Sequence, residues 1–135
     1  MGRGLVRNHE DWEVYQIAFE AAMEIFELTK QFPKEERYSL TDQMRRSSRS
    51  VCANLAEAWR KRLYKAAFIA KLSDSAAEAA ETQTWLAFSK RCHYLDQATE
   101  QRMKQTYDQV LGRLVSLINN ADRWVVKGGG VKGEG

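Results

Sequence analysis

Apolar residues recur at helical spacing along residues 40–59, and the pattern of the chain is clearest there. Side chains three and four positions apart share one face of an α-helix. The positions that keep this spacing are Leu40, Met44, Ser47 or Ser48, Val51, Leu55 and Ala58 or Trp59. Arg45, Arg49 and Arg60 fall about 100–160° from Met44 on a helical wheel. The pattern predicts a basic amphipathic helix that packs on one side and carries cations on another.

Three more stretches keep the same period, at residues 11–32, 64–92 and 98–124. The stripe of the first is Trp12, Tyr15, Phe19, Ala22, Phe26 and Thr29, and Ile17, Ile25 and Leu28 broaden it. The stripe of the second is Phe68, Leu72, Ala76, Ala79, Thr82, Leu86 and Ser89. The stripe of the third is Met103, Tyr107, Val110, Leu114, Leu117, Ile118 and Ala121. Four helices with short connections predict an all-α, antiparallel, up-down-up-down four-helix bundle.

Pro33 separates the first two helices. The residue before a proline is pushed out of the α region, so the first helix should end at Phe32. Proline is tolerated in a first turn, and Glu35 and Glu36 suit the positive end of a helix dipole. We therefore expect the helix to restart at Pro33 and to run into residues 40–59.

Length and composition indicate one domain. The chain has 135 residues, 44% of them apolar, which is enough to bury a core. It has one proline, and its glycines are concentrated toward the two ends. We expect a flexible basic lead-in at residues 1–7, the bundle at residues 8–124 and a flexible glycine-rich tail at residues 125–135. Two cysteines, with no signal-like start and no membrane-length apolar run, predict a cytoplasmic protein with reduced thiols and no membrane contact.

The net charge of +3 conceals a strong segregation of charge. Residues 37–65 hold eight cations and two acids, a net charge of +6, whereas residues 8–32 carry −5 with histidine neutral. A basic helix of this kind attracts either a polyanion or an acidic helix of a neighbouring protein. Both partners remain open at this point.

The sequence offers no constellation for catalysis, a metal or a cofactor. His9 and His93 fall at opposite ends of the predicted core, and neither follows a glutamate by three residues as a di-metal bundle requires. Cys52 has arginines nearby but no local base, and Cys92 beside His93 is one pair where structural zinc needs four ligands. No glycine-rich phosphate loop is present. We expect a protein that is not an enzyme.

Acidic side chains on the later helices fit interhelix ion pairs better than paired catalytic acids. Glu78 and Glu81 share a face, and Arg46 points away from the other arginines, so it suits an intramolecular bridge. The residues predicted to hold helices together are Arg46, Asn54, Glu57, Asp74 and Glu78.

The aromatic residues are not interleaved with cations as they are in single-strand binders. The early aromatics, such as Phe19 and Phe26, fit a core or a subunit interface. Trp59 is the one aromatic beside a cation run that could stack on a base, and a core position is the preferred interpretation.

Several motifs resemble one family. They are Asp11-Trp12-Glu13-Val14-Tyr15, Phe32-Pro33-Lys34-Glu35-Glu36-Arg37-Tyr38-Ser39-Leu40, Gln43-Met44-Arg45-Arg46-Ser47, Ser50-Val51-Cys52-Ala53-Asn54-Leu55-Ala56-Glu57-Ala58, Lys71-Leu72-Ser73-Asp74-Ser75 and Glu78-Ala79-Ala80-Glu81-Thr82. Together they resemble the four-helix-bundle proteins encoded in bacterial 23S ribosomal RNA intervening sequences. That resemblance implies a ring-like homopentamer, and the family includes accessory variability proteins of retroelements, which bind a reverse transcriptase and nucleic acid. Ala58 and Arg60 depart from a common glycine-rich continuation of the motif.

Two functions follow as expectations. The first is an oligomeric protein that binds RNA or DNA backbones through the predicted cationic surface, namely Arg45, Arg49, Arg60, Lys61, Arg62 and Lys65. The second is an interaction scaffold, or an accessory subunit of a partner such as a reverse transcriptase. In that case the arginines would pair with acids of a neighbouring subunit or partner, for example Arg49 with Glu24.

Overall fold

The computed structural model describes residues 5–126, and these form four α-helices and three short 3₁₀ turns. The α-helices are α1 (Glu13–Thr29), α2 (Leu40–Arg60), α3 (Lys65–Arg91) and α4 (Gln97–Asn119). The 3₁₀ turns are η1 (His9–Asp11), η2 (Lys34–Glu36) and η3 (Ala121–Arg123). The described residues contain no strand, which confirms the all-helical prediction.

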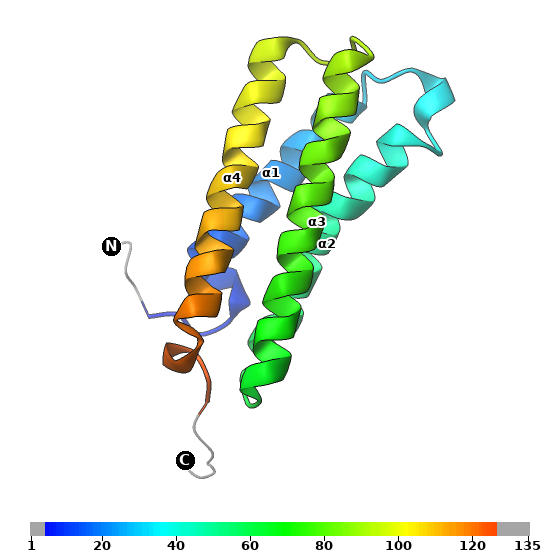
Figure 1. The fold of residues 1–135 in the computed structure, drawn as a ribbon. Helices are drawn as coiled ribbons and strands as arrows, with labels where there is room; N and C mark the ends of the chain where they lie inside the picture. The colour runs from blue at the N-terminus through cyan, green and yellow to red at the C-terminus, as the bar shows by residue number, and fades with distance from the viewer. Residues whose placement is uncertain (1–4, 127–135) are drawn as a thin grey trace.

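The helices pack side by side, and each contacts the next in the cyclic order α1, α2, α3, α4. Figure 1 shows that the link between α3 and α4 lies at one end of the bundle. The link between α2 and α3 lies at the other end, together with the start of α1 and the end of α4 (Figure 1). Most of residues 1–7 and 125–135, predicted to be flexible, lie outside the described residues.

The predicted core face of α2 is the buried face in the structure. Met44, Val51, Leu55 and Ala58 are each 0% exposed. The sequence period was sufficient here because cations and small polar residues occupy the other faces.

The interface between α2 and α3 also buries hydroxyl groups, and each of them has a partner. Ser75 Oγ donates to the Val51 carbonyl at 2.8 Å, and Thr82 Oγ1 donates to Ser47 Oγ at 2.8 Å. Small hydroxyl side chains allow close approach of the helices, and their hydrogen bonds offset the cost of burying polar atoms. These two bonds, one turn apart on α2, connect α2 to α3 within the core.

The stripe predicted for the first helix is confirmed at its two ends and wrong in its middle. Trp12 and Thr29 are each 3% exposed, as the stripe predicted. Between its two ends, the face that α1 buries is formed by Val14, Ala18, Ala21 and Ile25. Phe19 is 45% exposed, although the sequence pattern placed it on the packing stripe. Both stripes keep helical spacing and are about one residue apart on the helix, so periodicity alone could not choose between them. The face with the small residues Ala18 and Ala21 is the buried one, because small side chains allow α1 to approach its neighbours closely.

The connection between α1 and α2 also differs from the prediction. Regular α-helix ends at Thr29, and i to i−3 hydrogen bonds tighten the chain from Lys30 to Phe32. The expected restart at Pro33 is only the short turn η2, and α2 begins at Leu40 after Ser39, which has non-helical dihedral angles. The break places residues 37 and 38 in an exposed corner.

Three tryptophans close the end of the bundle where the described termini lie. Trp12 and Trp59 meet edge to face with ring centroids 4.9 Å apart, and Trp12 and Trp124 do so at 5.5 Å. Trp59 is 6% exposed, so the core interpretation of this residue is confirmed and it offers no free ring face beside the cations. Val126 N–H donates to the Arg62 carbonyl at 2.9 Å and joins the segment after η3 to the link after α2.

Candidate nucleic-acid interface

A groove of about 620 Å³ runs along the first half of α2 and the corner before it. Four arginines and one acid, Asp42, line it together with small or polar side chains. The lining residues are Arg37, Tyr38, Thr41, Asp42, Arg45, Arg46, Arg49, Ser50 and Ala53. We call this surface the basic groove.

Arg45 is fixed in place by α1. Its Nε donates to Thr29 Oγ1 at 2.8 Å, and one of its terminal nitrogens donates to the Phe26 carbonyl at 3.4 Å. The guanidinium also lies 4.7 Å from the centroid of the Phe26 ring. A cation at the C-terminal end of α1 is favourable because the last carbonyls of a helix carry partial negative charge. Arg45 therefore contributes a positive charge to the groove in a defined position.

Arg37 and Arg49 are the more accessible cations of the basic groove. Both are exposed, and neither forms an ion pair with a carboxylate among residues 5–126. Arg49 lies 6.0 Å from the Phe26 ring centroid, and Arg37 lies 5.9 Å from the ring of Tyr38. Their charges are available to an anionic ligand without breaking an existing ion pair.

Arg46 has a different role, because two acids of α3 hold it. It forms an ion pair with Glu78 at 3.3 Å and another with Glu81. Burial alone would lower the pKa of the Arg46 guanidinium, but the two carboxylates together raise it. The charge of Arg46 is thus neutralised within the chain, and the pairs join α2 to α3.

Of the other predicted interhelix residues, Glu57 bonds to another helix, whereas Asp74 and Asn54 bond within their own helices. Glu57 bonds to Lys71 of α3 at 2.6 Å, and this hydrogen bond lowers the pKa of the Glu57 carboxyl group. Asp74 lies 3.8 Å from the same lysine on its own helix. Asn54 donates to the Ser50 carbonyl of its own helix at 3.0 Å. The prediction that Asn54 and Asp74 bridge helices is corrected accordingly, since their bonds are local to α2 and α3.

The second half of the predicted cationic surface lies at the opposite end of α2, outside the basic groove (Figure 1). Arg60 and Lys61 are exposed there, and Lys65 pairs with Asp122 at 2.9 Å. Arg62 lies 3.5 Å from the Trp59 ring centroid and donates its Nε to the Trp59 carbonyl at 2.9 Å. The structure therefore does not join the six predicted cations into one surface, because helix length separates Arg49 from Arg60 by about 16 Å along the axis.

Sequence reasoning missed Tyr38. Its side chain is 86% exposed and lines the basic groove next to Arg37. The available signal was an aromatic residue directly after an arginine, in the corner that Pro33 creates. The expected continuous helix across residues 33–59 concealed that corner.

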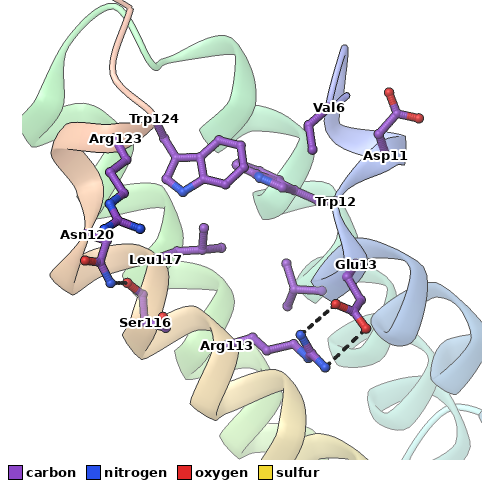
Figure 2. Close-up of a pocket in the computed structure, with 11 residues that line it drawn as sticks. Val6, Asp11, Trp12, Glu13, Arg113, Ser116, Leu117, Asn120, Arg123 and Trp124 are labelled. Atoms are coloured by element: carbon purple, nitrogen blue, oxygen red, sulfur yellow. Dashed lines mark hydrogen bonds and ion pairs between the residues drawn. The ribbon is translucent and has the colours of Figure 1, made fainter. Parts of the chain in front are cut away.

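A second hollow of about 470 Å³ lies where the beginning of α1 faces the end of α4. Figure 2 shows Arg113 and Glu13 joined by two contacts across its edge, at 2.9 and 3.3 Å. The Asp11 carboxylate caps η1 by accepting from the backbone N–H of Asn8 at 3.4 Å, and it also accepts from the backbone N–H of Arg7 at 2.8 Å. The lining charges, two acids and two arginines, balance. This hollow therefore lacks the excess of cations that distinguishes the basic groove.

Within residues 5–126, no three side chains of the usual ligand types come together as a metal site would require. Cys52 is buried, and burial raises its pKa to about 12, which keeps the thiol protonated. In the same part of the chain, no helix has the length and apolar character needed to cross a bilayer.

These observations define an all-helical, four-helix bundle protein with a cationic groove on its second helix. Residues 10–116 match the 23S rRNA-intervening sequence protein family, and the chain belongs to that family. A similar solved structure is that of a protein with unknown function from the S23 ribosomal protein family of Bacteroides thetaiotaomicron. It is 29% identical, covers 78% of this chain and 95% of its own, and superposes with a TM-score of 0.72. No curated protein sequence matches the chain.

Proposed function

We propose that the protein is a non-enzymatic nucleic-acid-binding protein whose basic groove contacts phosphates. The observation that carries the proposal is the set of groove cations without a carboxylate partner among the described residues, Arg37, Arg45 and Arg49. Phosphate backbones attract such groups through counterion release and through charge-assisted hydrogen bonds, and this binding is largely independent of sequence.

The acids of α1 support this function over pairing between the arginines and a neighbour's acidic helix. Glu13 is bound by Arg113 and Glu24 by Arg102, both from α4 of the same chain. Glu27 is paired with Lys30, the residue directly after α1. Half of the six acids in residues 8–32 are thus neutralised by the chain itself, whereas Arg37, Arg45 and Arg49 of the basic groove have no carboxylate partner among residues 5–126. The suggested Arg49 to Glu24 contact between subunits would have to share the Glu24 carboxylate with Arg102.

Binding of labelled RNA at low salt tests the proposal. Replacing Arg37 and Arg49 by alanine together should weaken binding by roughly tenfold, since two exposed charge contacts of about 0.7 kcal/mol each add to that factor. Arg45 is kept in this variant because it also holds α1.

A matched control removes the same charge elsewhere. Arg91→Ala with Lys104→Ala deletes two exposed cations outside the basic groove and should leave affinity nearly unchanged. A third variant, Arg60→Ala with Lys61→Ala, measures the second cationic cluster. Equal losses of RNA affinity in all three variants would show that net charge alone attracts RNA, and they would contradict a specific role for the basic groove.

A second candidate function is a protein-interaction scaffold or accessory subunit, and the exposed face of α1 favours it. Phe19 and Met23, one turn apart, are each 45% exposed. We propose that each chain is an antiparallel bundle and that the chains assemble as a homo-oligomer. In that assembly a second copy of the chain covers this face of α1. The number of five subunits follows only from the family resemblance.

Sedimentation velocity of the purified protein tests assembly directly. An oligomer is expected, and Phe19→Ser should shift the distribution toward the monomer because it removes apolar area from the contact. A wild-type protein that sediments as a monomer of 15.6 kDa would contradict self-association. That outcome would leave the binding proposal for the basic groove intact.

A further inference from the structure

The most exposed aromatic ring of the described chain lies at the basic groove. Tyr38 is 86% exposed, and the next most exposed aromatic residue is Tyr64 at 67%. An exposed large side chain by itself needs no explanation. The neighbours of this ring are what distinguish it, because it shares the groove with Arg37, Arg45 and Arg49, which have no carboxylate partner within residues 5–126.

From these neighbours we infer that the groove selects single-stranded nucleic acid, with an unpaired base stacked on Tyr38 and the flanking phosphates at the arginines. This inference rests on the proposed function and names its substrate class. Base stacking on an aromatic side chain is tolerant of sequence, as is contact with phosphates. The two contacts together describe a site that holds a strand without reading its sequence.

The geometry explains why a duplex should bind less well. In a duplex both faces of a base are covered by its neighbours, so a protein ring can stack only after a base leaves the helix, which costs a few kcal/mol. A single strand offers base faces without that cost. A duplex would therefore meet the groove through its phosphates alone, and Tyr38 would contribute little.

The arrangement of the cations fits a strand that follows the groove. Arg45 and Arg49 are one helical turn apart on α2, so their Cβ atoms are separated by about 6 Å along one face. Arg37 stands at the corner before α2, next to Tyr38. A strand whose base stacks at the corner can therefore continue along α2 past two more cations.

The test compares the affinity of the protein for two probes. One is a labelled oligouridylate of about 12 nucleotides, a length within the range of single-strand site sizes, and the other is the duplex that this strand forms with oligoadenylate. The wild-type protein should bind the single strand more tightly. Tyr38→Ala should weaken single-strand binding by roughly 5- to 150-fold, the range of one stacked base, and should change duplex binding little. Tyr38→Phe should retain single-strand affinity, because the ring and not the hydroxyl makes the contact.

Tyr64→Ala provides the matched control, since Tyr64 is also exposed but lies on the link between α2 and α3, outside the basic groove. It should leave both affinities unchanged. An oligodeoxyuridylate of the same length then identifies whether RNA or DNA is preferred, and binding of either sugar agrees with the inference.

Binding by the wild-type protein and by Tyr38→Ala distinguishes failure of the single-strand inference from failure of the proposed function. If the wild-type protein binds strand and duplex equally and Tyr38→Ala changes neither, the single-strand inference is wrong and the basic groove remains a phosphate site. If the wild-type protein binds neither probe at low salt, the proposed function fails and the inference fails with it.

Discussion

The two cysteines differ in burial, and they should therefore differ in the reactivity of their thiols. Cys52 lies in the core, and burial raises its pKa to about 12, whereas Cys92 is exposed at the end of α3. The thiolate is the reactive form of cysteine. At neutral or mildly alkaline pH, Cys52 is thus both protonated and shielded.

A thiol-reactive dye should therefore label only Cys92 in the native protein and both cysteines in denaturant. Mass spectrometry of the labelled chain gives the count, and Cys92→Ser serves as the control that should abolish native labelling. Rapid native labelling of Cys52 would contradict its placement in the core.

At the residue scale, the sequence predicted those site residues that helical geometry alone determines. Arg45 and Arg49 were placed correctly on α2 because their angle from the core face follows from the helical period. The exposed corner that holds Tyr38 could not be predicted in this way, and for Trp59 the core position was predicted but its partners were not. Trp59 is covered by Trp12 and Trp124, which come from the two distant ends of the chain.

Among the elements, α4 contains a position where glycine is unfavourable. Gly112 lies in the middle of this helix, and a Cβ added there would meet nothing within 4 Å. Glycine in a helix interior costs about 0.5–1 kcal/mol relative to alanine, because the unfolded chain has more freedom to lose.

Gly112→Ala should accordingly raise the free energy of unfolding by about 0.5–1 kcal/mol. Urea denaturation would show a higher midpoint with an unchanged slope. The reverse change at an exposed alanine of α3, Ala87→Gly, should lower the free energy of unfolding by a similar amount. A lower midpoint for Gly112→Ala would mean that this part of α4 is not a regular exposed helix.

The helices differ in how well the sequence predicted their packing faces. In α2 and α3 the predicted and buried faces agree closely. Polar residues border the apolar stripe of α2, and the largest buried side chains of α3, Phe68, Leu72 and Leu86, follow one helical spacing. In α1 apolar residues extend around much of the surface, so the large aromatics suggested one face while Ala18 and Ala21 occupy the buried one. Which face packs depends on the neighbouring helices, and that information is absent from the local pattern.

For the whole molecule, the number of helices and the absence of strands in residues 5–126 follow from the spacing of apolar residues and from the scarcity of helix breakers. The basic groove could be predicted only in part. Its charge excess is visible in the sequence, but its extent depends on ion pairs that cross the bundle. Glu78 and Glu81 neutralise the charge of Arg46. The break before α2 places Arg37 and Tyr38 in the lining of the groove.

The most direct test of the central claim is the salt dependence of oligouridylate binding by the wild-type protein and by the Arg37→Ala, Arg49→Ala variant. The logarithm of the association constant should fall linearly with the logarithm of salt concentration for the wild type. Each lost phosphate contact reduces the slope for a single strand by about 0.7, so the variant should be shallower by about 1.4. Equal slopes for the two proteins, or wild-type binding that does not change with salt, would contradict the account.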